Sequence, residues 1–424
     1  MNLNRQYLII GGIGALVILI GLALTFGLGQ KPATPEPVSL EMWGFEDGGG
    51  DIWEAVITKF RETNPHVSVQ YKSFAPASYE EMLVNRLAEG KGPDIFLLTG
   101  EQLEKQRDKI LALPPASSPL SPGQFSTMFV DGAARLMGDD GTLYGTPVFM
   151  DSLILFYNKD MFDAAGFTRA PATWDEFTVI SRRLTTVAPN GDIVRSGAAM
   201  GSASNVSHAM ELVSALILQQ GDPVVRRDGH VELGDAALRA FDFYASFTTP
   251  GNPNYTWMGA MPESLHAFAT ESAAMAFGFS DDIARVVAEN PHLNFATASF
   301  PQPLQGNTRT YGAYMFPAVS RATKNMPAAW QFALYASSRE GAGVYLAKTA
   351  RPPARRDIIE TTPEGSGSAS VLARSALIAR NWPVPDEKLA RRVFNEAIDG
   401  MARRTYTVSE ALGRIRSKLQ LLFP

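Results

Sequence analysis

The chain has 424 residues, of which 45% are hydrophobic, 19% are charged and none is cysteine, and its formal net charge is −5 at pH 7. This length predicts roughly two to three domains of about 150 residues each, and the composition excludes a disordered, collagen-like or multi-span membrane protein. The lack of cysteine excludes disulfides, thiolate metal sites, cysteine nucleophiles and lipid attachment through cysteine.

The residue types also argue against metal and nucleic-acid partners. The five histidines are scattered, and no two of them have the spacing that a histidine-built zinc site needs. Residues 38–350 are acidic overall, whereas binding to nucleic acid needs a basic stripe. We therefore expect no metal, no other cofactor and no nucleic acid.

The N-terminal segment carries the signal of a membrane anchor. No charge occurs from Leu8 to Gly29, and Arg5 precedes this stretch. At about 1.5 Å per residue it can cross the roughly 30 Å hydrocarbon core, and it is longer than the apolar region of a typical signal peptide. We predict an uncleaved transmembrane helix over residues 1–29, with a cleaved signal peptide as the alternative. Arg5 keeps the start cytoplasmic, so the folded part lies on the extracytoplasmic side of the cell membrane.

The first part of the body alternates strands with helices. Residues 30–37 contain three prolines and predict a stiff linker. After it, the pattern of apolar residues predicts elements in the order strand, helix, strand, helix, strand. These are residues 38–43, 52–64, 67–74, 78–89 (opened by a capping box from Ser78 to Glu81) and 94–98. This order indicates a parallel sheet with helices on its faces, that is, an α/β fold.

The remainder of the chain is richer in helices. Residues 152–157 predict a strongly apolar strand, and Thr173 and Thr407 are expected to cap helices. Further helices are predicted at 208–219, 235–247, 327–337 and 340–348 and in the C-terminal tail, and further strands at 274–279, 294–298 and 311–319. Two α/β lobes joined by strands account best for this pattern.

Catalytic signatures are missing from the sequence. No phosphate-binding loop, HExxH zinc motif or GxSxG nucleophile elbow is present. The acidic and glycine-rich turn at residues 46–51 lacks the spacing of a calcium loop. This turn follows a parallel strand, where open α/β sheets form their binding crevice, so it is either a ligand contact or a solvated turn.

The motifs from residue 38 to residue 422 resemble a known family. In chain order they include LEMWGF at residues 40–45, GPDIF at 92–96, LYGTP at 143–147, LFYNKDMF at 155–162, PATWDEF at 171–177, AAWQF at 328–332 and TVSEAL at 407–412. Each is weak alone, but the ordered set is similar to that of the family-one extracellular solute-binding proteins of ABC importers, which include the maltose-binding proteins.

The resemblance implies a two-lobe periplasmic-binding-protein-like fold of type II with hinge strands. Lobe one would take in residues 38–149 and 302–320, and lobe two residues 150–300 and 322–424. In such a fold the solute contacts both lobes only when they close, so binding is converted into a shape that a transporter can recognise.

The resemblance also places candidate residues in the cleft between the lobes. Aromatic rings would cover the C–H face of a sugar, and carboxylates would accept hydrogen bonds from its hydroxyls. The ligand-binding candidates are Trp43, Phe45, Asp47, Thr99, Glu101, Asp151, Phe279, Ser280, Asp281, Tyr311, Tyr314 and Arg351. The alternatives are that Trp43 packs in the core and that Asp151 caps a helix or forms an ion pair at the hinge.

The implied function is a solute-binding receptor, not an enzyme. It would be a monomer that delivers a small solute, a sugar or oligosaccharide, to the permease subunits of an ABC importer. One alternative is a membrane-tethered sensory or scaffold ectodomain that reports to a membrane partner; another is a hydrolase that uses Asp47 and Asp151. Residues 205–220 and 386–393 lack the aromatic residues that maltose-binding relatives often have there, so the solute stays open.

Overall fold

The computed structural model describes residues 36–45, 50–226, 228–365 and 367–423. The predicted anchor over residues 1–29, most of the linker and the candidate Asp47 lie outside the described residues. Within the described part, no helix combines the length and the apolar character needed to cross a membrane.

The first sheet is built around a parallel core of three strands. β1 (Val38–Phe45) pairs in parallel with β2 (Val67–Phe74) on one side and with β3 (Ile95–Thr99) on the other. Helices α2 (Asp51–Thr63) and α3 (Pro76–Ala88) connect these strands. The predicted order of strands and helices is therefore confirmed, and parallel pairing brings the carboxyl ends of β1 and β3 to one edge of the sheet.

The start of α3 differs from its prediction. The helix begins at Pro76, two residues before the expected capping box, and the proline occupies a position whose missing N–H costs nothing. The Ser78 hydroxyl donates to the carbonyl of Ala75 at 3.3 Å, so it lies inside the first turn and does not cap the helix. The caps at Thr173 and Thr407 are confirmed, since both side chains accept backbone N–H groups three residues later.

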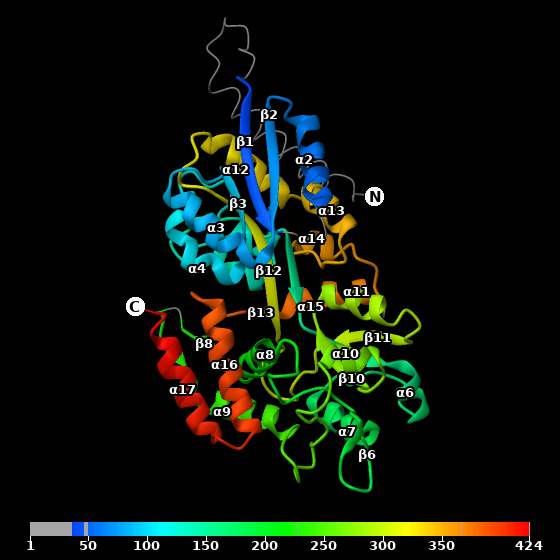
Figure 1. Cartoon of the computed structure of the whole chain (residues 1–424). Coiled ribbons are helices and arrows are strands. Elements are labelled where there is room, and N and C mark those ends of the chain that lie inside the picture. Colours follow the sequence, from blue (N-terminus) through cyan, green and yellow to red (C-terminus); the bar gives the residue numbers. More distant parts are fainter. Residues whose placement is uncertain (1–35, 46–49, 227, 366, 424) are drawn as a thin grey trace, which may run out of the picture.

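Two helices correct the predicted boundary between the lobes. The predicted lobe two takes in residues 322–424, but α12 (Met326–Ala336) and α13 (Arg339–Lys348) both contact α2 beside the first sheet (Figure 1). The ring of Phe332 meets that of Phe60 edge to face at 5.1 Å between centroids. The two helices are far from α2 in the chain, but burial of their aromatic side chains against it stabilises this arrangement.

A single long strand links the two cores of the molecule. β12 (Thr310–Val319) pairs antiparallel with β3 and with β4 (Phe149–Ser152), and in parallel with β13 (Ala379–Arg380). The whole strand belongs to the six-stranded first sheet, yet the side chain of Tyr311 near its start is buried in the second hydrophobic cluster. In Figure 1 the strand runs from the upper part of the molecule into the lower part.

The strand predicted at residues 152–157 is divided between the two sheets. β4 ends at Ser152 in the first sheet, and β5 (Ile154–Asn158) begins the second. β5 lies between β10 (Met275–Gly278) and β11 (Phe295–Ser299), both antiparallel to it. At the break, the Leu153 N–H donates to the carbonyl of Tyr311 at 2.9 Å, so the chain changes sheets while remaining bonded to β12.

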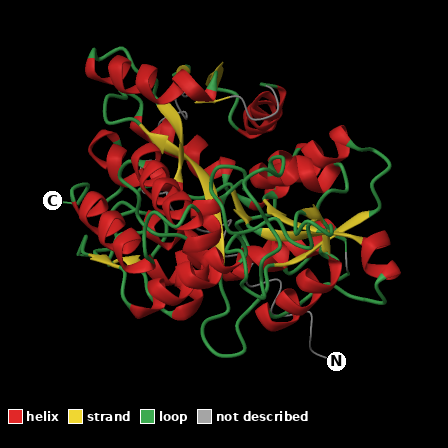
Figure 2. Ribbon diagram, turned by 60° about the horizontal axis from the view of Figure 1, so that its bottom comes forward, coloured by secondary structure: helices red, strands yellow, loops and turns green. Residues whose placement is uncertain are grey.

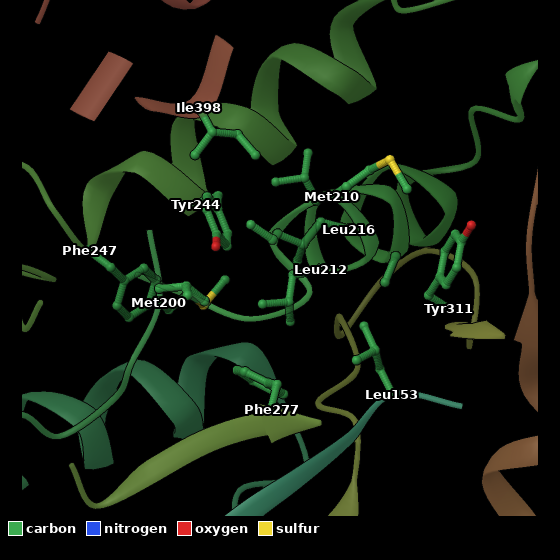
Figure 3. Packing of buried hydrophobic residues seen from close by; sticks show 14 of the residues in the cluster. Leu153, Met200, Met210, Leu212, Leu216, Tyr244, Phe247, Phe277, Tyr311 and Ile398 are labelled. Atoms are coloured by element: carbon green, nitrogen blue, oxygen red, sulfur yellow. The ribbon is translucent and has the colours of Figure 1, made fainter. Parts of the chain in front are cut away.

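The second core is organised around the buried helix α8 (Ala209–Gln220). Met210, Leu212 and Leu216 are almost fully buried and pack among side chains from other elements, such as Tyr244 and Ile398 (Figure 3). Because nearly every face of α8 is buried, its apolar residues are spread around the helix and do not form a single stripe.

The remaining elements complete the two layers around the strands, and Figure 2 shows helices flanking the strands on several sides. In the first half of the chain they are η1 (Gly100–Gln102), α4 (Leu103–Gln106), η2 (Arg107–Lys109), α5 (Pro122–Met128), η3 (Asp131–Leu136), α6 (Lys159–Ala164), α7 (Trp174–Leu184), β6 (Thr186–Val187) and β7 (Ile193–Arg195). In the second half they are β8 (Val224–Val225), β9 (Val231–Glu232), α9 (Asp235–Ser246), α10 (Ser264–Ala269), α11 (Ser280–Glu289), α14 (Arg356–Ile359), α15 (Ser368–Ile378), α16 (Glu387–Ala402) and α17 (Val408–Gln420).

Two glycines of α13 test how tightly this helix is packed. A Cβ atom at Gly341 would lie 2.1 Å from the carbonyl oxygen of Tyr335, whereas a Cβ atom at Gly343 would meet nothing within 4 Å. We expect Gly341→Ala to lower the free energy of unfolding by more than about 1 kcal/mol through this clash. Gly343→Ala, the matched control, should raise it by up to about 1 kcal/mol through helix propensity. Urea denaturation measures both, and equal effects would contradict the packing described for α13.

Candidate functional site

A cavity of about 180 Å³ lies where the edge of the first sheet faces the start of α16. On the first-sheet side it is bounded by the ends of β1 and β3 and by α3 and α4. The lining residues that the structure describes are Phe45, Pro76, Tyr79, Glu80, Thr99, Glu101, Gln102, Lys105, Val384, Pro385, Asp386, Glu387 and Lys388. A neighbouring hollow of about 590 Å³ continues it between α3 and α16 and shares Glu80, Lys105, Asp386 and Lys388.

Three of the predicted candidates meet at this cavity. Phe45 is the last residue of β1, Thr99 is the last residue of β3, and Glu101 lies in η1. Parallel pairing of β1 and β3 is what brings these positions together, as the sequence pattern predicts. The other described candidates lie outside the lining.

Glu101 is the buried acid of the cavity. Only 7% of the residue is exposed. Burial raises the pKa of its carboxyl to about 7, and the Glu387 carboxylate from the other wall adds to this increase. The Arg135 guanidinium and the Thr99 hydroxyl act in the opposite direction but do not cancel it. Near neutral pH this carboxyl can therefore both donate and accept hydrogen bonds.

Aromatic rings form the apolar wall of the cavity. The half-buried ring of Phe45 meets Tyr79 edge to face at 5.4 Å between centroids. The Tyr79 hydroxyl donates to the carbonyls of Trp43 and Leu97, at 3.1 and 2.9 Å, and this pair of bonds fixes the orientation of its ring. A rigid aromatic surface of this kind suits the C–H face of a ring-shaped solute.

Trp43 belongs to the core and not to the cavity. It is 6% exposed, its indole N–H donates to Glu41, and its ring packs against Phe74 at 4.9 Å between centroids. Of the two predictions for Trp43, ligand contact or core packing, its contacts match core packing. Side chains alternate along a strand, so Trp43 and Phe45 share a face of β1, but only Phe45 reaches the open edge.

Tyr311 and Tyr314 are buried in the second and first clusters, at 2% and 1% exposure. Figure 3 shows Tyr311 beside Met210 and Leu153, with its hydroxyl away from Leu153. Neither hydroxyl has a hydrogen-bond partner among the described residues.

Gly100 lies against the ring of Tyr314, and a Cβ atom added to Gly100 would come within 2.4 Å of that ring. Glycine therefore allows η1 to sit close enough to β12 to present Glu101 to the cavity.

Asp151 and Ser280 meet at the junction of β4 with α11. The Ser280 hydroxyl donates to the Asp151 carboxylate at 2.6 Å, the Ser280 N–H donates at 3.2 Å, and the Ser152 N–H donates at 2.8 Å. Burial raises the pKa of Asp151 to about 6, against the opposing effect of these bonds and of Arg351. The carboxylate thus caps α11 from the other sheet, which is the alternative that the sequence left open.

Arg351, Asp281 and Phe279 extend this junction. The Arg351 guanidinium forms an ion pair with Asp281 and lies over the ring of Phe149 at 4.2 Å from its centroid. The Phe279 ring meets His208 edge to face at 4.9 Å. Arg351 thus connects Phe149 of the first core with Asp281 of α11, whereas Phe279 packs against the second core.

The wall contributed by the second core is Val384–Lys388, which carries the charged Asp386, Glu387 and Lys388 and no aromatic ring. Arg391 of α16 bonds to Glu211 of α8 and to Glu387, at 2.5 and 2.8 Å. Burial would raise the pKa of Glu211, but the Arg391 guanidinium outweighs this effect and lowers it. These residues lie in the two stretches that the sequence shows to be without aromatic residues. No group of three or more acidic or histidine side chains suited to a metal ion occurs among the described residues.

Comparison with known proteins identifies the family. The bacterial extracellular solute-binding proteins match residues 46–343, more than two thirds of the chain. The chain belongs to this family. The predicted resemblance is thereby confirmed, as is the prediction that the chain is not an enzyme, since its relatives are substrate-binding proteins of ABC transporters. Membership also supports an extracytoplasmic place for the folded part.

The relatives of this solute-binding protein include sugar binders. It is 22% identical over 359 residues to the diacetylchitobiose binding protein DasA of Streptomyces coelicolor, a match that covers 82% of this chain and 80% of the relative. It is 22% identical over 319 residues to the multiple sugar-binding protein of Streptococcus mutans, with 72% of each chain covered.

Solved structures confirm the fold. A cyclo/maltodextrin-binding protein complexed with maltotetraose superposes with a TM-score of 0.74 at 17% identity, covering 92% of this chain and 98% of that one. The sugar-binding protein MalE from Xanthomonas citri also gives 0.74, at 19% identity, covering 91% and 97%. The α/β periplasmic-binding-protein-like architecture is therefore established for this solute-binding protein.

Sequence reasoning missed the cavity residues that come from distant segments. Tyr79 reads as an ordinary helix residue, and Val384–Lys388 lie 283 or more residues beyond Glu101 in the chain. The proline-rich turn before α16 followed by consecutive charges was the only local signal for this wall.

The raised pKa of Glu101 predicts a pH-dependent effect of Glu101→Gln. Because the folded-state pKa of about 7 exceeds the ordinary 4.5, the folded protein retains a proton that the unfolded chain releases, and stability is lost as pH rises between these values. At pH 5 the substitution should leave the free energy of unfolding nearly unchanged, and at pH 8 it should raise it by about 1–3 kcal/mol. Urea denaturation at both pH values measures this. Glu81→Gln on the exposed face of α3 is the control, and an equal response of both variants would exclude a buried Glu101.

Proposed function

We propose that this protein is an extracytoplasmic receptor that binds a small solute, a sugar or oligosaccharide, and delivers it to an ABC importer by closure of two lobes. Each lobe is centred on one of the two hydrophobic cores, and β12 and the β4–β5 crossing serve as hinge strands. In this proposal the protein acts as a monomer, and the N-terminal segment anchors it to the cell membrane as a single-pass helix.

The cavity at the seam carries the proposal. Its walls come from both cores, with Phe45 and Glu101 on one side and Glu387 on the other. A solute held there contacts both walls at once, and this differential contact is what allows binding to favour a closed state. Its similarity to a diacetylchitobiose binding protein and to a multiple sugar-binding protein supports a carbohydrate as the solute.

The chemistry of the lining suits a single sugar ring. Rings of Phe45 and Tyr79 offer an apolar face, and the carboxyl of Glu101 offers a hydrogen-bonding group in a largely dry site. At about 180 Å³ the cavity is smaller than the roughly 300–1,000 Å³ of a drug-sized site, so it takes one ring, and the adjoining hollow leaves room for further rings of an oligosaccharide.

The direct test is ligand-induced stabilisation of the full-length protein. In a panel of mono- and oligosaccharides, a solute at 100 times its Kd should raise the free energy of unfolding by about 2.7 kcal/mol. Phe45→Ala should weaken binding of that solute about tenfold, because the apolar face of the ring loses its platform. Leu304→Ala, at a side chain that is 75% exposed, is the matched control. Absence of stabilisation by every solute in the panel would contradict the proposal.

Co-purification from native membranes tests the transport role separately. Recovery of permease subunits with the receptor supports import. Recovery of a kinase or other signalling receptor in their place would favour a sensory ectodomain.

A further inference from the structure

The charges around the cavity do not balance. Its lining carries four acidic side chains and two lysines, and most of them have a partner. Glu80 pairs with Lys105 at 2.8 Å, and Asp386 caps α16 by accepting the N–H of Leu389 at 2.9 Å. Lys388 is the second lysine, at the outer rim that the cavity shares with the neighbouring hollow.

Glu101 is the acidic side chain of the lining that these interactions leave without an ion pair. Among the described residues it forms no ion pair within 4 Å, since the nearest basic group in electrostatic terms, Arg135, lies against Glu104 at 3.7 Å. Arg135 also donates to the carbonyl of Gly100 and to the Asn381 side chain, at 3.3 and 3.1 Å. Arg135 therefore acts on Glu101 without an ion pair within 4 Å, and its effect on the pKa of that carboxyl is smaller than the effect of burial.

The opposite wall adds negative charge. Arg391 is shared between Glu211 and Glu387, so a single guanidinium serves two carboxylates. Glu101 and Glu387 line the same cavity from opposite walls, and Glu387 is joined through Arg391 to Glu211, which lies outside the lining. With four acidic side chains against two lysines the lining is negative overall, and a buried charge without a counter-charge is costly.

We propose that the cavity selects a solute that carries a protonated amine, with the amine held between Glu101 of one wall and Glu387 of the other, so that amino sugars are its ligand class. This inference rests on the proposed solute-binding function and narrows it. Without such a solute, a proton on Glu101 relieves the repulsion, in keeping with the pKa of about 7 for this carboxyl. An ammonium group replaces that proton and adds charge-assisted hydrogen bonds.

The rest of the lining agrees with an amine-bearing ring. Phe45 and Tyr79 supply an aromatic wall, which accommodates both the C–H face of a sugar and a neighbouring cation. The second-core wall supplies carboxylates and no aromatic ring. A stacking ring in that place would bind neutral and amino sugars equally well, whereas carboxylates favour the amino sugar. The charged groups that share the lining with Glu101 are Glu80 of α3, Lys105 of α4, and Asp386, Glu387 and Lys388 at the start of α16, while Arg135 of η3 acts on it from outside the lining.

The test compares each amino sugar with its neutral parent. Glucosamine, galactosamine and the β-1,4 dimer of glucosamine are titrated calorimetrically into the full-length protein at pH 6.5, beside glucose, galactose and cellobiose. We expect the amino member of at least one pair to bind tenfold or more tightly than its parent. Glu101→Gln should remove this preference while retaining the binding of the neutral parent. Glu360→Gln, which removes the same charge from an exposed position at the end of α14 and outside the cavity and the hollow, should keep the preference.

Each outcome separates the inference from the proposed function. Binding of neutral sugars with equal or higher affinity than the amino sugars would overturn the amine preference and leave the solute-binding function intact. A preference that survives in Glu101→Gln would also overturn it. Failure of every sugar to bind would reject the proposed function and this inference together.

Discussion

The molecule depends on one strand that belongs to both of its cores. β12 hydrogen-bonds to β3, β4 and β13, so its backbone groups are paired on both sides. Tyr311 is buried in the second core and Tyr314 in the first. Because a shift of one residue would turn every side chain to the opposite face, the register of β12 is strongly specified. The two cores are therefore joined at a fixed position along β12.

This constraint also positions the chemistry. Tyr314 supports Gly100, and Gly100 places Glu101 at the edge where parallel strands end. The Glu101 carboxyl is consequently buried opposite α16. Its pKa is raised chiefly by this burial and then by Glu387, which is far away in the sequence. The junction between β4 and α11 is stabilised independently by Asp151, whose carboxylate accepts hydrogen bonds from Ser280 and from the backbone N–H of Ser152.

The two walls of the cavity differ in their chemistry. One offers aromatic rings on a rigid sheet edge, and the other offers the charges of Asp386, Glu387 and Lys388, with Glu387 joined through Arg391 to Glu211. A ring binds many solutes through their apolar faces, whereas fixed carboxylates discriminate by charge. This combination distinguishes the cavity from one whose walls are all aromatic.

The amino-acid sequence by itself determined the elements and the family. β2 and the inward face of α2 were predictable because their apolar residues repeat at the period of a strand or a helix, and Glu101 was predictable because it follows a parallel strand. The tertiary structure alone decided that α12 and α13 pack on α2, that Tyr311 and Tyr314 are buried, and that the start of α16 forms the opposite wall. Periodicity reports only which face of an element is apolar. Which surface covers that face depends on contacts between residues far apart in the chain, and the burial and charge of the site arise from those contacts.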